Sequence, residues 1–202
     1  MENFSQARKL TYFSVLTALT VILQFIGGYL HIGPVNLNLT LIPLVICGMI
    51  LGIFYSTMLG FIIGAVFLIQ GITGFEPFTA YLFGDSPVLL SLTCVLKTTV
   101  AGFVGAIIYK TLKNKNKYLA TFLSAAAVPM VNTGIFILGM LLIQNSLIGF
   151  LAGAGIDVSG KSAIYLILVV VVTWNFFIEL ALNLMVAPAL YRVIKIIDKN
   201  LG

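Results

Sequence analysis

Residues 164–190 read IYLILVVVVTWNFFIELALNLMVAPAL, and this stretch decides the fold class of the chain. It holds a single charged residue, Glu179, and no basic residue. An α-helix needs about 20 apolar residues to cross the roughly 30 Å of hydrocarbon in a bilayer. The stretch therefore predicts a transmembrane helix with one carboxylate far from either end.

The rest of the chain has the same character. Of its 202 residues, 60% are hydrophobic and 8% are charged, and the mean hydropathy is +1.14. A soluble protein of this length has too small an interior to bury so much apolar surface. We therefore predict an all-α, polytopic membrane protein that forms a single membrane domain over residues 1–202. Its six predicted spans are residues 10–30, 37–51, 54–72, 88–109, 118–143 and 164–190.

The basic residues predict the orientation of these spans. Nine of the eleven lie in three clusters, at residues 8–9, 110–117 and 192–199. Basic loops face the cytoplasm in most membrane proteins. Both termini are therefore expected inside, which requires an even number of crossings. Topology also explains the net charge of +5, so we predict no nucleic-acid partner.

Lys97 and Glu179 are the two charged residues deep inside apolar stretches. A charge at the bilayer centre costs at least ~2.5–3.5 kcal/mol, so each needs a partner or a function. Their predicted depths are similar. The sequence leaves open whether they form a structural ion pair or belong to a ligand site.

Other polar residues are expected close to these two. Asn175 precedes Glu179 by four residues, which places both on one face of a helix. Asn36 and Asn38 alternate with apolar residues, which predicts an extended lead-in to the second span. We predict that one cavity holds the substrate and is lined by Asn36, Asn38, Lys97, Asn132, Asn175 and Glu179.

Catalytic, metal and cofactor motifs give little support to an enzyme. The sequence has one histidine, no HExxH, CxxC or GxSxG motif, and we predict no metal and no cofactor. Residues 155–162 match the GxxxxGK[ST] phosphate-loop pattern. That motif follows a buried strand in ATPases, whereas here it joins two predicted spans, so we reject it.

The chain resembles the substrate-binding S components of energy-coupling factor (ECF) transporters. The similar segments are SVLTA at 14–18, NLTLIP at 38–43, KTTVAGFVGAIIYK at 97–110, PMVNTGIFILG at 129–139 and NFFIELALNLMVAP at 175–188. Together they extend over almost the whole sequence.

This resemblance implies a vitamin-binding subunit of the bacterial cell membrane, without catalytic activity. It also implies three partners, namely a transmembrane coupling (T) protein and two cytoplasmic ATPases. Ser14 and Ala18 correspond to the family's AxxxA docking pattern, with serine at its first position. The vitamin is left open, with pantothenate or riboflavin as the expected class. The alternative is a stand-alone secondary transporter coupled to protons through Glu179.

Overall fold

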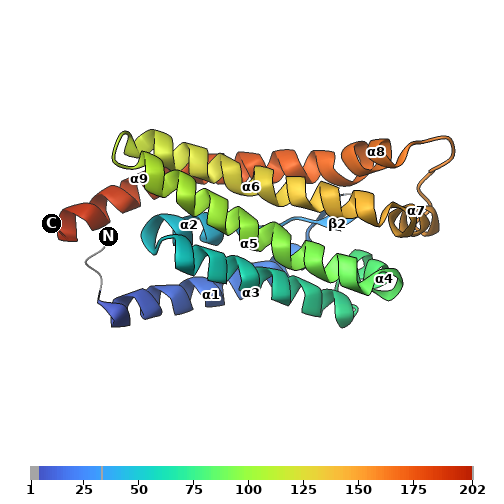
Figure 1. Ribbon diagram of the computed structural model, residues 1–202, viewed down its shortest axis with the longest axis horizontal. Helices are drawn as coiled ribbons and strands as arrows, with labels where there is room; N and C mark the ends of the chain where they lie inside the picture. Colours follow the sequence, from blue (N-terminus) through green and yellow to red (C-terminus); the bar gives the residue numbers. More distant parts are fainter. Residues whose placement is uncertain (1–4, 33, 202) are drawn as a thin grey trace.

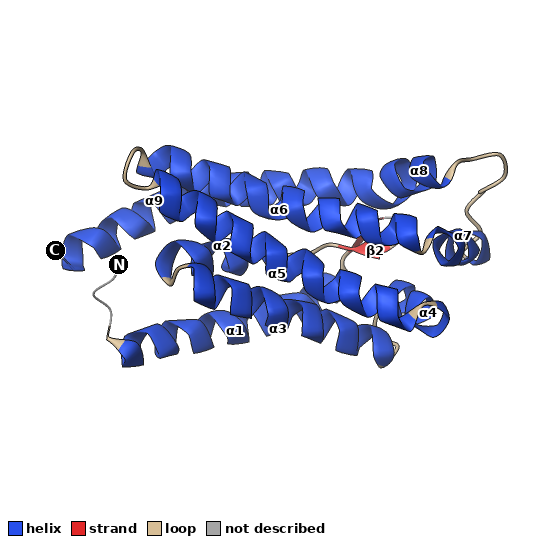
Figure 2. Ribbon diagram, in the orientation of Figure 1, coloured by secondary structure: helices blue, strands red, loops and turns tan. Residues whose placement is uncertain are grey.

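The computed structural model describes residues 5–32 and 34–201 of the chain, and the side chains of His31, Ile32 and 197–201 are left aside. Long helices run side by side in a bundle (Figure 1), and the two short strands are the β structure seen in the described residues (Figure 2). The elements are α1 (Gln6–Tyr29), β1 (His31–Ile32), β2 (Val35–Asn36), α2 (Leu41–Ile50), α3 (Ile53–Ile72), α4 (Pro77–Asp85), α5 (Pro87–Leu112), α6 (Lys117–Leu142), α7 (Gln144–Gly153), α8 (Ala163–Tyr165), the π-helical η1 (Leu166–Val172) and α9 (Thr173–Leu201).

Five helical segments are long and apolar enough to cross a membrane. They are α1, α3, α5, α6 and the continuous helix Ala163–Ile196, and they contain five of the six predicted spans except for the last residue of spans 10–30 and 118–143. The prediction of an all-helical membrane protein is therefore confirmed for the described residues.

The segment predicted as the second span, residues 37–51, has a different form. Its helix, α2, has ten residues, a length of about 15 Å and half of the hydrocarbon thickness. Before it, β2 pairs with β1 in an antiparallel hairpin, so the extended lead-in is observed at Val35 and Asn36. After it, Gly52 adopts a φ of +91°, which separates α2 from α3. Glycine tolerates this conformation because it has no Cβ atom.

α5 is the central helix of the bundle and packs most extensively against α3 and α6. Small residues permit this close approach. A Cβ atom on Gly60 of α3 would lie 2.3 Å from the backbone oxygen of Thr98 on α5. On the other side, Ser124 of α6 donates a hydrogen bond to the backbone oxygen of Gly105 at 2.8 Å.

The buried apolar side chains form two clusters along the bundle. One cluster lies towards the end that holds the start of α1 and the end of α9, and it includes Phe13, Leu44 and Ile194. The second cluster lies towards α4 and α7, and it includes Phe78 and Leu147. We call these the terminal end and the α4–α7 end of the bundle (Figure 1).

α1 lies at the edge of the bundle and packs on α2, α3 and β2. Its buried residues form one stripe, whereas large apolar side chains such as Val15 and Ile22 are about 60% exposed. A helix with this pattern in a membrane faces lipid or another protein along most of its surface.

Candidate substrate cavity

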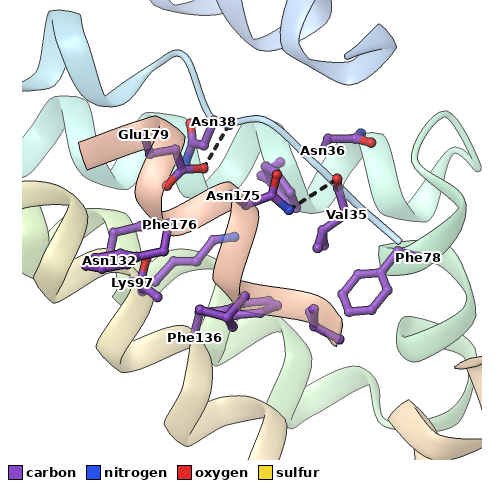
Figure 3. Close-up of a pocket in the computed structure, with 14 residues that line it drawn as sticks. Val35, Asn36, Asn38, Phe78, Lys97, Asn132, Phe136, Asn175, Phe176 and Glu179 are labelled. Atoms are coloured by element: carbon purple, nitrogen blue, oxygen red, sulfur yellow. Dashed lines mark hydrogen bonds between the residues drawn. The ribbon is translucent and has the colours of Figure 1, made fainter. Parts of the chain in front are cut away.

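Polar side chains from four parts of the chain line a cavity within the bundle (Figure 3). Its walls are formed by the extended segment that precedes α2, by the helices α3, α4, α5 and α6, and by the continuous η1–α9 helix. Its space between atoms, including the open mouth, is about 490 Å³. The lining residues are Val35, Asn36, Asn38, Phe67, Phe78, Lys97, Asn132, Thr133, Phe136, Val171, Val172, Asn175, Phe176 and Glu179.

The six residues predicted from sequence to share one cavity all belong to this lining: Asn36, Asn38, Lys97, Asn132, Asn175 and Glu179. They come from four segments that are far apart in the sequence. Their meeting follows from the cost of exposing polar groups to hydrocarbon, which turns each helix until its polar face points inward. Whether they bind a substrate stays a prediction.

Lys97 reaches the cavity from the middle of α5 and is 6% exposed. Its Nζ atom lies 4.0 Å from the ring centroid of Phe67 and 5.2 Å from that of Phe136. Both distances are within the range of cation–π attraction, because the face of an aromatic ring carries negative partial charge. Two rings therefore flank the ammonium group, and no described residue accepts a hydrogen bond from it.

Glu179 has a different partner from the one considered in the sequence. Its Oε1 atom accepts a hydrogen bond from the backbone N–H of Asn38 at 3.0 Å (Figure 3). Among the described residues, the structure has no ion pair between Glu179 and Lys97. The two groups are therefore not in ion-pair contact in this structure, because the carboxylate is bonded to the segment before α2 and the ammonium group lies against two phenylalanine rings. Whether the two charges serve as a structural pair or as ligand groups stays a prediction.

The extended segment is fixed to α9 at a second point. The Nδ2 atom of Asn175 donates to the backbone oxygen of Val35 at 3.4 Å, one turn of α9 before Glu179 (Figure 3). A non-helical segment at membrane depth has backbone groups that must find partners inside the protein. Asn175 and Glu179 supply two of these partners, so the same residues line the cavity and hold one of its walls.

Several buried amide atoms of the lining have no hydrogen-bond partner among the described residues. They are Oδ1 of Asn36, Nδ2 of Asn38 and Oδ1 of Asn132. Leaving a buried polar atom unpaired costs about 1–3 kcal/mol, so native proteins keep few of them. Three such atoms lie around one cavity, where water or a polar ligand can supply the missing partners.

The aromatic walls were not among the predicted site residues. Phe67, Phe78, Phe136 and Phe176 all line the cavity. Two of them carried a signal in the sequence, because Phe136 follows Asn132 by one helical turn and Phe176 adjoins Asn175. Phe67 had none, since one phenylalanine in an apolar helix resembles any other.

Asn183 has a structural role. It is buried, and its Nδ2 atom donates to the backbone oxygen of Glu179 at 2.9 Å, within α9. It does not line the cavity. No group of three potential metal ligands occurs among the described residues.

The predicted docking residues, Ser14 and Ala18, are both exposed on α1. They lie outside the cavity lining, on the long helix that packs least against the rest of the bundle. Their position on an open surface agrees with the prediction, while docking itself stays a prediction.

Long apolar helices around an internal polar cavity define a multi-pass membrane protein that binds a small solute. The family comparison then identifies the kind of protein. Residues 8–191 match the family described as "ECF transporter, substrate-specific component". The chain belongs to this family, as its sequence resemblance predicted. No curated protein matches the chain.

Proposed function

We propose that this protein captures a water-soluble vitamin on the outer side of the bacterial plasma membrane and delivers it inward as the substrate-binding subunit of an ATP-driven importer. The observation that carries this proposal is the cavity with unpartnered amide atoms inside a membrane bundle. The family works with a T protein and ATPases. We propose one T protein and two cytoplasmic ATPases as the partners of this chain, which has no catalytic role of its own.

For the topology we propose six crossings by a single membrane domain, with both termini in the cytoplasm. The lead-in and α2 together make the second crossing, as an extended half followed by a helical half. Two observations support this arrangement. The start of α1 and the end of α9 lie at the same end of the bundle (Figure 1), and the three basic clusters gather at that end.

The chemistry of the cavity favours a ligand with an anionic or strongly accepting group beside Lys97 and several hydrogen-bonding groups beside the asparagines. Phe78 and Phe176 add apolar surface to the walls. A free buried ammonium group is better matched by the carboxylate of pantothenate than by the uncharged ring system of riboflavin. We therefore propose a carboxylate-bearing vitamin of the pantothenate class, with riboflavin as the competing ligand to be tested.

Reconstitution tests the function. We expect radiolabelled vitamin to accumulate in proteoliposomes when this chain is combined with the T protein and two ATPases and ATP is enclosed. We expect no accumulation by this chain alone under a pH gradient. Uptake by the chain alone, driven by the gradient, would instead establish the stand-alone proton-coupled transporter.

An Ala18→Trp variant separates binding from docking. The indole would block close approach of a partner helix to α1, because small residues at such surfaces let helix backbones come close. Since Ala18 is exposed and outside the cavity lining, we expect vitamin binding to be unchanged while ATP-driven uptake is lost. The control is Val15→Trp, at a neighbouring exposed position of α1 outside the small-residue pair. Loss of binding in Ala18→Trp would show that this face is internal.

An Asn132→Leu variant tests whether the unpartnered amides serve a ligand. Leucine has the same number and branching of side-chain heavy atoms and removes a buried oxygen that has no partner among the described residues. We therefore expect equal or higher thermal stability but about 5- to 30-fold weaker vitamin binding, since a lost hydrogen bond to a ligand costs on the order of 1–2 kcal/mol. Asn183→Leu is the matched control, because it removes an amide that bonds within α9 and should leave the affinity unchanged. Lower stability with unchanged affinity in Asn132→Leu would assign this residue a structural role.

A further inference from the structure

A second hollow lies at the terminal end of the bundle, at the turn between α2 and α3. Its space between atoms is about 850 Å³, including the open mouth, and it shares no lining residue with the substrate cavity. Nothing in the proposed uptake function accounts for it.

The charges around this hollow are all positive. Lys9 of α1 and Lys110 and Lys113 of α5 contribute to its lining, which contains no acidic residue. Among the described side chains, no carboxylate lies within ion-pairing distance of these three lysines. Two helices that are distant in the sequence thus bring three cations to one place, and no described carboxylate neutralises them there.

The first turn of α3 adds to this positive potential. Gly52 is the N-cap residue and lines the hollow, and no described side chain caps the helix there. The first backbone N–H groups of a helix carry partial positive charge and bind anions readily. α3 has 20 residues, so its N-terminal dipole is fully developed.

Apolar residues form the other part of the lining. Met49, Ile53 and Phe54 belong to it, and Phe54 is 73% exposed. A hollow with cations on one side and apolar surface on the other fits a molecule with an anionic head and an apolar tail. Basic pockets between membrane helices bind the headgroups of anionic lipids in this way.

Cytoplasmic loops of membrane proteins are generally rich in basic residues, but this tendency alone does not place lysines around a hollow. Lys115 and Lys117 belong to the same basic cluster as Lys110 and Lys113 but lie outside the lining. The convergence of Lys9 with two lysines of α5 is a property of the fold.

We propose that this hollow is a binding site for the phosphate headgroup of an anionic phospholipid. The lysines and the start of α3 bind the phosphate, and the acyl chains lie along Ile53 and Phe54. Free inorganic phosphate is the alternative ligand to be distinguished, because it has the same anionic group as the lipid headgroup but no acyl chains.

Native mass spectrometry of the full chain in a neutral detergent tests the proposal, because a micelle has no charged bilayer surface. The probes are dioctanoyl phosphatidylglycerol, dioctanoyl phosphatidylcholine and inorganic phosphate. The test variant is Lys9→Gln/Lys110→Gln/Lys113→Gln. The control, Lys115→Gln/Arg192→Gln/Lys195→Gln, makes the same change in net charge at exposed positions outside the hollow. Replacement of the first three lysines by arginine keeps the charge.

We expect the wild-type chain to retain phosphatidylglycerol in preference to phosphatidylcholine. The test variant should lose this preference by on the order of 100-fold, while the control and arginine variants keep it and all four proteins melt at similar temperatures. Equal losses in test and control variants, or no loss in either, would overturn the proposal. Retention of inorganic phosphate as tight as that of phosphatidylglycerol would also overturn it, in favour of a soluble anion. A different outcome is that the test and control variants bind lipid and phosphate equally and differ only in binding of the purified T protein. In that case the hollow is a contact site for a protein, and the proposal is wrong.

Discussion

A Lys97→Met variant is expected to bind the vitamin about 30- to 4,000-fold more weakly than the wild type, which corresponds to about 2–5 kcal/mol for a buried charge contact. Methionine preserves the length of the side chain, and its sulfur contacts aromatic rings favourably. It therefore keeps the packing against Phe67 and Phe136 while removing the charge. Thermal stability should change little, because Lys97 is not held in an ion pair with Glu179.

Two probes make this test specific for the anionic group. Titration calorimetry with pantothenate and with pantothenol, the alcohol that lacks the carboxylate, should show a strong preference for pantothenate in the wild type. Lys97→Met should remove this preference rather than weaken both ligands equally. The control is Lys161→Met, which changes a lysine that pairs with Asp157 in a loop away from the cavity. If Lys97→Met bound pantothenate as tightly as the wild type does, Lys97 would not belong to the proposed carboxylate site. The same would follow if the wild type bound riboflavin and did not bind pantothenate.

Two glycine-to-alanine changes should shift stability in opposite directions. In Gly60→Ala the new Cβ atom would lie 2.3 Å from the backbone oxygen and 2.8 Å from the backbone carbon of Thr98. Backbone atoms are unable to move aside by a rotamer change, so α3 and α5 must separate. We expect a loss of about 1–3 kcal/mol or more in the free energy of unfolding, as for other overpacked cores.

Gly134→Ala is the matched control within α6. No atom lies within 4 Å of the Cβ position there, and alanine favours a helix over glycine by about 0.5–1 kcal/mol. We expect this variant to be slightly more stable than the wild type. Thermal unfolding in detergent, followed by circular dichroism, measures both. A loss of similar size in the two variants would show that the close α3–α5 contact is not the cause of the loss in Gly60→Ala.

The sequence by itself determined the class of the protein and the polar composition of its cavity. Apolar stretches such as residues 164–190 have no stable place outside a membrane, so composition and length suffice to predict membrane helices. Desolvation likewise forces Lys97, Asn132 and Glu179 to face the interior, because hydrocarbon offers them no partner. Both conclusions depend only on the solvation energies of the residues within each segment, so they can be drawn without knowing how the segments pack.

The tertiary structure decided how these parts combine. Residues 37–51 are apolar enough for one helix, yet α2 begins only at Leu41, and the backbone N–H of Asn38 before it bonds to Glu179 of α9 instead of within a helix. Lys97 and Glu179 lie at similar depth, yet one contacts phenylalanine rings and the other a backbone N–H. Depth follows from the position of a residue in its own helix. Which groups meet at a given depth depends on the rotation and spacing of neighbouring helices, and these are set by contacts such as Gly60 with Thr98 between segments distant in the sequence.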